Sequence, residues 1–347
     1  MFMQRLSYIN EVIKKNRIPI NFLLVAAIYT YSFSLLHIMK SSYYPSFVAL
    51  VSGRAQAPFQ YRILIPWLAR VFGPYIIKYI PFIDHMNGVK TLFEFVAVFV
   101  LLLAFFLISP LLITEKALLP AKKEIIGWLS IWLLIFALPF LYLIPDRIFY
   151  FPSDIPGILF MILGLICMRR QKWLLYYSVF ILGILNRETI CFLTLTYLIT
   201  NWNITPRTKL LAHFFTQVFL WIGVKILLWY LFHANGGASA GYADAFGLFR
   251  NSWEYNRITL SNLLSYPDML SVYGYLWFPL IALWKSIPDR WLKSAILTVP
   301  LFHVAMLIPG GINELRIYGE MLPLVILGVV AGVANIISQR VQLRELD

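Results

Sequence analysis

The sequence is poor in charge, and poorest in acidic residues. Only 16 of its 347 residues are Asp or Glu, and charged residues of both signs make up 13% of the chain, whereas an ordinary soluble domain carries about a quarter. The hydrophobic share of 60% and the mean hydropathy of +0.75 indicate that lipid surrounds most of the chain. Long linkers, low-complexity tracts and internal repeats are also missing, so we predict one transmembrane domain over residues 1–347.

Cysteine and histidine are scarce as well. The two cysteines, Cys167 and Cys191, lie within apolar runs and lack the paired spacing of a zinc or redox site, so we expect ordinary core thiols. No pair of His or carboxylate residues has the spacing of metal ligands on one helix face. We therefore predict no metal site and no required cofactor. Mg²⁺ stays open, because it needs few protein ligands.

Basic residues are the exception to this scarcity and give a net charge of +13. They collect in short loops between apolar runs, as membrane orientation requires, and this placement argues against a nucleic-acid partner. Basic residues also precede the first apolar run, which has no small-residue cleavage site after it, and this pattern is typical of a retained signal anchor. We expect a multi-pass protein of the cell inner (plasma) membrane with both termini cytoplasmic.

The apolar runs predict an all-α, polytopic membrane protein with about ten transmembrane or half-membrane helices, because a hydrocarbon core of about 30 Å needs roughly 20 residues of helix. The expected spans are 20–39, 91–114, 125–144, 155–168, 172–185, 189–200, 209–232, 270–284, 294–308 and 320–338.

Residues 63–82 form another apolar stretch, but Arg70, Lys78 and three prolines make a transbilayer helix costly there. We expect this segment to lie along the outer surface with its basic side chains among the headgroups.

The segment 172–200 has basic clusters on both sides and the polar sequence Asn186-Arg187-Glu188-Thr189 in its middle. Two short helices that form a hairpin fit best, and arms of about 13 residues rise only about 20 Å. The charged tip would then lie below the headgroups and need buried partners or a water-filled cavity. The alternative is one tilted helix, which would reverse every later span.

With the hairpin topology, polar side chains converge on the outer half of the membrane, where ionisable groups are functional candidates by default. Besides Glu94, Asp146, Arg147, Asn313 and Glu320, they are Gln60, Tyr61, Arg62, Asp154, Asn186, Arg187, Glu188, Lys225, His303, Glu314 and Arg316.

Each candidate also has a purely structural explanation. Asp154 could only cap a helix N-terminus, and Arg316 could only pair with Glu320 four residues later on one helix face. Arg62 and Lys225 could extend towards the headgroups, and His303 could be a hydrogen-bonded core residue. Glu94 and Asp146 are assigned structural roles. Arg187 and Glu188 are harder to explain this way, because adjacent helical residues do not face each other.

As a set, these residues suit a phosphorylated lipid, because guanidinium groups bind phosphate oxygens in a bidentate way and a nearby carboxylate can act as general base. The stretches Pro58-Phe59-Gln60-Tyr61-Arg62, Ser153-Asp154-Ile155-Pro156, Asn186-Arg187-Glu188 and Glu314-Leu315-Arg316 carry the pattern. With them the chain resembles small bacterial members of the GT-C class of polytopic glycosyltransferases.

The resemblance implies a GT-C-like fold and a membrane glycosyltransferase that moves a sugar, with inversion, from a polyprenyl-phosphate donor to a glycan, lipid or protein acceptor outside the membrane. That class usually has an acidic catalytic residue early in the first outer loop, and residues 40–83 contain none. Asp154 and then Glu188 are the candidates for the catalytic base. Arg62, Arg187 and Arg316 would hold the phosphate, with Gln60, Tyr61, Asn186, Lys225, His303 and Glu314 as further substrate contacts.

Two other functions fit the same residues. A transporter or flippase of a lipid-linked saccharide would use the same arginines, although the inner halves of the expected spans contain few ionisable residues. A polysaccharide polymerase would differ mainly in its donor. The glycine-containing and aromatic loop 233–269 is a candidate lid over the acceptor.

Overall fold

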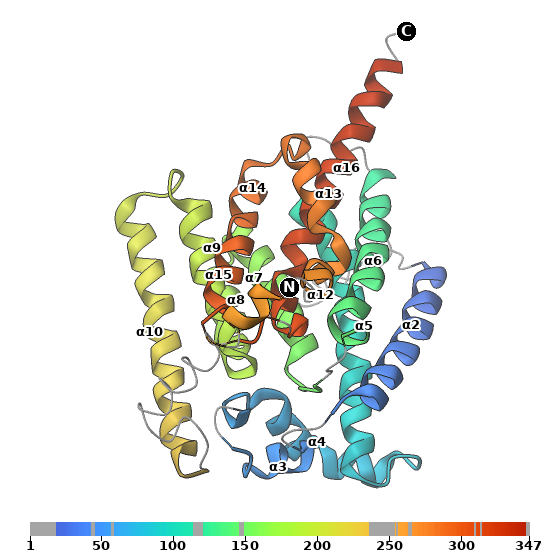
Figure 1. The fold of residues 1–347 in the computed structure, drawn as a ribbon, viewed down its shortest axis with the longest axis vertical. Helices are drawn as coiled ribbons and strands as arrows, with labels where there is room; N and C mark the ends of the chain where they lie inside the picture. The colour runs from blue at the N-terminus through green and yellow to red at the C-terminus, as the bar shows by residue number, and fades with distance from the viewer. Residues whose placement is uncertain are drawn as a thin grey trace, which may run out of the picture.

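The chain folds into a bundle of helices of very different lengths (Figure 1). The computed structural model describes residues 19–42, 46–56, 59–113, 121–145, 149–235, 254, 256–262, 266–308, 310–312 and 314–344. Within these ranges the structure is all-helical, and the only extended pairing is an isolated bridge between Ser42 and Phe149. The basic N-terminus, Asp146, Arg147, Asn313 and most of the loop 233–269 lie outside the described residues.

The α-helices, in chain order, are α2 (Ile20–Lys40), α3 (Phe47–Ser52), α4 (Leu64–Tyr79), α5 (Met86–Leu112), α6 (Ala121–Tyr142), α7 (Asp154–Arg169), α8 (Trp173–Asn186), α9 (Phe192–Asn201), α10 (Arg207–Phe232), α12 (Tyr266–Leu270), α13 (Trp277–Ala282), α14 (Arg290–Ile296), α15 (Thr298–Met306) and α16 (Leu322–Arg344). Short 3₁₀ segments join several of them: η1 (Phe59–Tyr61), η3 (Glu188–Cys191), η4 (His233–Asn235), η6 (Val272–Tyr275), η7 (Trp284–Ser286) and η8 (Leu315–Met321).

Five helical stretches in the described part of the chain are long and apolar enough to cross a membrane. They are Ile20–Lys40, Met86–Leu112, Lys123–Tyr142, Arg207–Asn235 and Leu315–Gln339. All five were expected from the sequence. The total of about ten crossings stays a prediction, because the remaining apolar helices are too short to span a bilayer alone.

The expected spans at 270–284 and 294–308 are broken into short pieces. In the first, the backbone turns left-handed from Tyr273 to Tyr275, with φ between 59° and 62°. Gly274 faces α6 there, and a Cβ at this position would come within 2.9 Å of Phe136. Close packing against α6 therefore interrupts a helix that hydrophobicity alone would continue.

The hairpin predicted at 172–200 is confirmed. Helix α8 ends at Asn186, Arg187 is extended with φ −159° and ψ 131°, and η3 and α9 follow. The chain returns along itself, because the rings of Trp173 and Tyr197, near the two far ends, are 5.5 Å apart. With 14 residues α8 rises about 21 Å, whereas the 26 residues of α10 rise about 39 Å. The turn therefore lies part of the way along the bundle.

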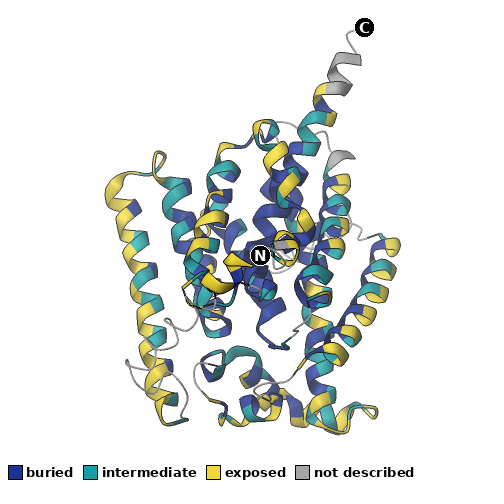
Figure 2. Cartoon of the chain, viewed as in Figure 1, coloured by how far each residue is buried: buried dark blue, intermediate teal, exposed yellow. Residues whose placement is uncertain are grey.

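The segment predicted as an interfacial helix is α4, which lies with α3 at one end of the molecule (Figure 1). Its inner face is formed by small residues, since Ala69 and Gly73 are buried while Trp67 and Tyr75 are exposed. Figure 2 shows that burial is greatest in the centre of the bundle. Helices α5, α6, α7 and α16 contribute most to this core, and α10 is exposed along most of its length.

Glu94 and the two cysteines were expected to have structural roles. Glu94 is buried and its Oε1 lies 2.8 Å from Nδ1 of buried His37, which agrees with a structural role. Cys167 belongs to the core, as expected for a core thiol, but Cys191 is only partly buried beside a groove. Neither thiol is in a disulfide.

Candidate functional site

The most deeply buried charges of the site gather around Arg187, at the hairpin turn. Its Nη1 donates to Oδ1 of Asp154 at 2.9 Å, and its Nε lies 2.8 Å from Oε1 of Glu320. The Arg187 side chain is 2% exposed and both carboxylates are 0% exposed. Thr189 donates a further hydrogen bond to Oε1 of Glu320. We call Arg187, Asp154 and Glu320 the buried centre.

Local structure explains why these three residues meet. The break after α8 points Arg187 towards the start of α7, where Asn186 donates from Nδ2 to the Ser153 carbonyl at 2.8 Å. Gly157 leaves room on α7, because a Cβ there would lie 3.3 Å from Oε1 of Glu320 and 3.6 Å from Cδ of Arg187. A buried arginine with two carboxylates needs such close packing to offset the cost of desolvation.

Arg316 extends the buried centre towards a more exposed edge. Its Nη1 lies 3.4 Å from Oδ2 of Asp154, and its Nη2 donates to Oε2 of Glu314 at 2.7 Å. The Arg316 side chain is 11% exposed and that of Glu314 is 40% exposed. Both oxygens of Asp154 are therefore engaged by arginines, one by Arg187 and one by Arg316.

Two of the structural explanations considered from the sequence are wrong. Asp154 does not act as a cap alone, because its side chain binds two arginines. Arg316 does not pair with Glu320, because residues 315–321 form a 3₁₀ segment, in which the third residue and not the fourth returns to the same face. Each residue therefore finds a different partner.

The second part of the site is the pair of Arg62 and Glu188, which we call the half-exposed pair. Nη2 of Arg62 donates to Oε1 of Glu188 at 3.1 Å, and the side chains are 16% and 31% exposed. Nε and Nη1 of Arg62 have no hydrogen-bond partner among the described residues, and neither does Nε of Arg316. These N–H groups are buried without partners, so an anion that reached them would satisfy their hydrogen-bonding capacity.

Phe151 connects the two parts of the site. The guanidinium carbon of Arg62 lies 5.3 Å from the centroid of this ring, and that of Arg316 lies 4.3 Å from it. Because both distances are measured to the same ring centroid, the two guanidinium carbons are within about 10 Å of each other. An anion placed beside Phe151 could reach donors from both arginines.

Helix α10 supplies a fourth basic group, Lys225. Nζ of Lys225 lies 5.2 Å from the ring centroid of Tyr61, which packs against Leu228 on the same helix. Trp221, one turn before Lys225, donates from Nε1 to the Glu188 carbonyl at 3.3 Å. Lys225 therefore lies close to the half-exposed pair.

Other residues predicted for the site have separate positions. Gln60 donates to the Leu50 carbonyl and accepts from the Ala55 amide, so it holds its own loop. His303 donates from Nδ1 to the Val299 carbonyl and stacks on Tyr318 with centroids 4.3 Å apart, which matches the core explanation. Outside the predicted set, Asp84 pairs with His85 at an exposed position, and this hydrogen bond lowers the pKa of Asp84.

The sequence interpretation missed two kinds of partner. Thr189 and Glu320 complete the environment of Arg187. Glu320 was among the polar residues expected in the outer half, but the only partner considered for it was Arg316. Phe151 directly precedes Pro152-Ser153-Asp154, and its proximity to that polar stretch was the one available signal. Three-residue clusters of His, Cys, Asp or Glu that could hold a metal do not occur among the described residues.

The site contains four basic side chains, Arg62, Arg187, Lys225 and Arg316, and four acidic ones, Asp154, Glu188, Glu314 and Glu320. It is balanced in formal charge, so an incoming anion must compete with a carboxylate for its donors. An incoming anion displaces a carboxylate most easily where water already reaches it, at Glu188 and Glu314, and least easily in the buried centre. Among the four carboxylates, Glu188 and Glu314 can therefore meet a substrate directly.

A scan against protein-family models and searches of curated proteins and of solved structures found no match to this chain.

Proposed function

We propose that this protein is an inverting membrane glycosyltransferase that moves a sugar from a polyprenyl-phosphate donor to an acceptor hydroxyl at the outer face of the membrane. The observation that carries the proposal is the half-exposed pair: an arginine with unsatisfied donors beside a carboxylate that water reaches. An anion-binding group and a base in one place are the minimum for transfer from a phosphate leaving group.

Glu188 is the better candidate for the base. Asp154, the first choice from the sequence, has both oxygens engaged by arginines and no exposure, so an acceptor hydroxyl would have to displace an arginine to reach it. Glu188 is 31% exposed, and its Oε1 pairs with Arg62. Asp154 and Arg187 then serve to fix the hairpin turn that presents Glu188.

The proposed reaction proceeds in one displacement. Glu188 removes the proton of the acceptor hydroxyl while that oxygen attacks the anomeric carbon of the donor sugar, and the bond from this carbon to the phosphate oxygen breaks. The phosphate leaves with the electron pair, and Arg62 with Arg316 and Lys225 stabilises its negative charge. Attack opposite the leaving group inverts the anomeric configuration. Glu314 lies beside Arg316, where it could accept hydrogen bonds from sugar hydroxyls.

The experiment uses purified protein in liposomes, given polyprenyl-phosphate sugars and candidate acceptors. Wild type should form product, and Glu188→Gln should lose about 100-fold or more of the rate. Asp154→Asn is compared after checking its thermal stability. Turnover that survives in both variants would exclude this site. Movement of the lipid across the bilayer with no transfer would instead support a transporter.

Topology is tested separately by labelling single cysteines with a membrane-impermeant reagent. Asn203, in the turn between α9 and α10, is expected to react only from the inside. Reaction from the outside would place the site on the cytoplasmic face and overturn the proposed orientation.

A further inference from the structure

Helix α10 lies at the edge of the bundle and packs against it along one narrow strip. Its buried residues are Leu210, Gln217 and Leu228, one strip of a 26-residue helix, and Figure 2 shows the rest of it as exposed or half-buried. An apolar groove runs along each side of this strip. The two grooves differ in whether a charged side chain lies at one end.

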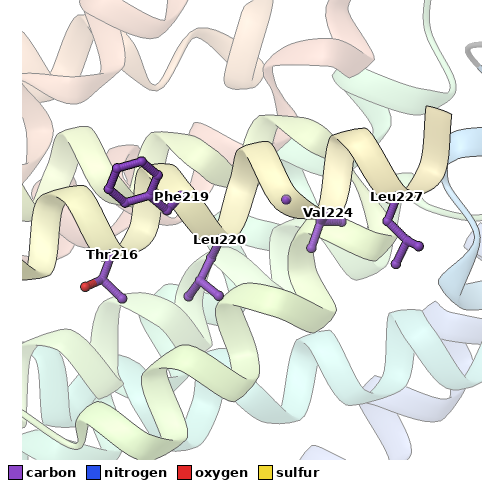
Figure 3. Close-up of a pocket in the computed structure, with 6 residues that line it drawn as sticks. Thr216, Phe219, Leu220, Val224 and Leu227 are labelled. Atoms are coloured by element: carbon purple, nitrogen blue, oxygen red, sulfur yellow. The ribbon is translucent and has the colours of Figure 1, made fainter. Parts of the chain in front are cut away.

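The first groove has a volume of about 480 Å³ and is formed by one face of α10 (Figure 3). Its lining includes Thr216, Leu220, Gly223 and Leu227. A Cβ at Gly223 would meet no atom within 4 Å, so this part of the groove is open. We call it the α10 outer groove.

The second groove lies between α9 and α10, with a volume of about 270 Å³. Phe214, Val218 and Trp221 line it from α10, while Cys191 and Leu195 line it from the hairpin. We call it the α9–α10 groove.

Helix geometry distinguishes the grooves. Residues spaced i, i+4, i+7 and i+11 form one stripe along a helix. The stripe through Phe214, Val218 and Trp221 reaches Lys225 at the eleventh residue, beside Tyr61. The stripe through Thr216, Leu220 and Gly223 reaches Leu227 and has no charge.

The α9–α10 groove also touches the candidate site through two of its lining residues. Trp221 donates to the Glu188 carbonyl, and Cys191 is the last residue of η3, the segment that begins with Glu188. The groove is thus apolar along its length and basic at one end, over a stripe of about 16 Å. That distribution is complementary to a single-chain lipid with an anionic head.

We propose that the α9–α10 groove holds the first part of the hydrocarbon chain of the phosphorylated lipid, with its phosphate between Lys225 and Arg62. This inference rests on the proposed function and adds the path of the lipid chain to it. The α10 outer groove lacks a charged end, so it is filled by ordinary bilayer lipid without selection for a phosphate.

The test uses a long-chain isoprenyl phosphate with a photoreactive diazirine in its chain, and the matched isoprenyl alcohol, in nanodiscs of zwitterionic lipid. After irradiation, labelled peptides are located by mass spectrometry. The phosphate probe should label the walls of the α9–α10 groove about tenfold more than the alcohol does, and both should label the α10 outer groove equally.

Two matched variants fill one groove each. Val218→Trp should lower phosphate-dependent labelling about tenfold, and Leu195→Trp, from the opposite wall, provides a second variant in case the first fails to fold. Gly223→Leu fills the other groove, where no protein atom obstructs it, and should leave the labelling unchanged.

The outcomes separate the two proposals. Phosphate-dependent labelling that lies elsewhere, or that survives both tryptophan variants, would refute the lipid path while leaving the phosphate site in place. Equal labelling by phosphate and alcohol throughout the protein would refute the phosphate site itself, and with it the proposed function.

Discussion

Arg187 and Arg62 both lie near the hairpin turn and both face carboxylates, yet their surroundings differ. Arg187 is 2% exposed and lies between two carboxylates that are 0% exposed. Arg62 is 16% exposed, faces one carboxylate and keeps two nitrogens, Nε and Nη1, without a hydrogen-bond partner among the described residues. The same side chain therefore has a fixed structural environment in one place and an exchangeable one in the other.

This difference shows how a charged site can be both stable and usable. Charges sealed from water hold each other in one arrangement, because separating them would leave an uncompensated buried charge. Charges that water reaches gain little from each other and can be exchanged for a ligand at low cost. The buried centre thus fixes the turn, and the half-exposed pair, presented by that turn, is free to bind and react.

The largest effect is expected from Arg187→Ala. Among the described residues, Asp154 would keep only Arg316 as a basic partner and Glu320 would keep only Thr189, so the free energy of unfolding should fall by about 3–5 kcal/mol. Thermal unfolding in detergent, followed by size-exclusion chromatography of heated samples, measures this loss. Arg187→Lys should recover part of it by keeping the charge. A melting temperature equal to that of wild type would show that the buried centre contributes no stability.

Glu188→Gln should separate function from stability. Because Glu188 is 31% exposed, we expect a change of less than about 1 kcal/mol in the free energy of unfolding. Transfer should nevertheless fall about 100-fold or more, since an amide cannot accept the acceptor proton. Rates and melting temperatures measured on the same preparations decide this. Equal loss of both would place Glu188 with the structural residues.

Arg62→Lys should have a smaller effect, limited to binding of the lipid-phosphate sugar donor. Lysine keeps the positive charge but replaces the planar group, whose Nε and Nη1 lack partners among the described residues and offer donors in fixed directions. The KM for the lipid phosphate should rise about tenfold, with kcat less affected. Steady-state kinetics at varied donor concentration give both constants. An unchanged KM would mean that the phosphate binds without the guanidinium.

Much of this arrangement could be predicted from the sequence, because long apolar runs have few alternative structures. The five spanning helices and the hairpin followed from hydrophobicity and from the polar residues at 186–189. The ion-pair partners of the charged residues could not be predicted in this way. Arg316 and Glu320 were assigned helical spacing, but their segment is 3₁₀, and Asp154 looked like a cap because its two arginines are 33 and 162 residues away in sequence.

The smallest effect is expected from Glu314→Gln, which tests whether exposure alone decides the cost of losing a partner. Glu314 is 40% exposed and pairs with Arg316 at 2.7 Å, a shorter contact than the 2.9 Å of Arg187 with Asp154. If distance determined stability, its loss would cost as much as a change in the buried centre. Solvent screening predicts instead a change of less than about 0.5 kcal/mol, because water and a glutamine oxygen replace most of the interaction. A melting temperature lowered as far as in Arg187→Ala would contradict the distinction between the two environments, and an unchanged one would support it.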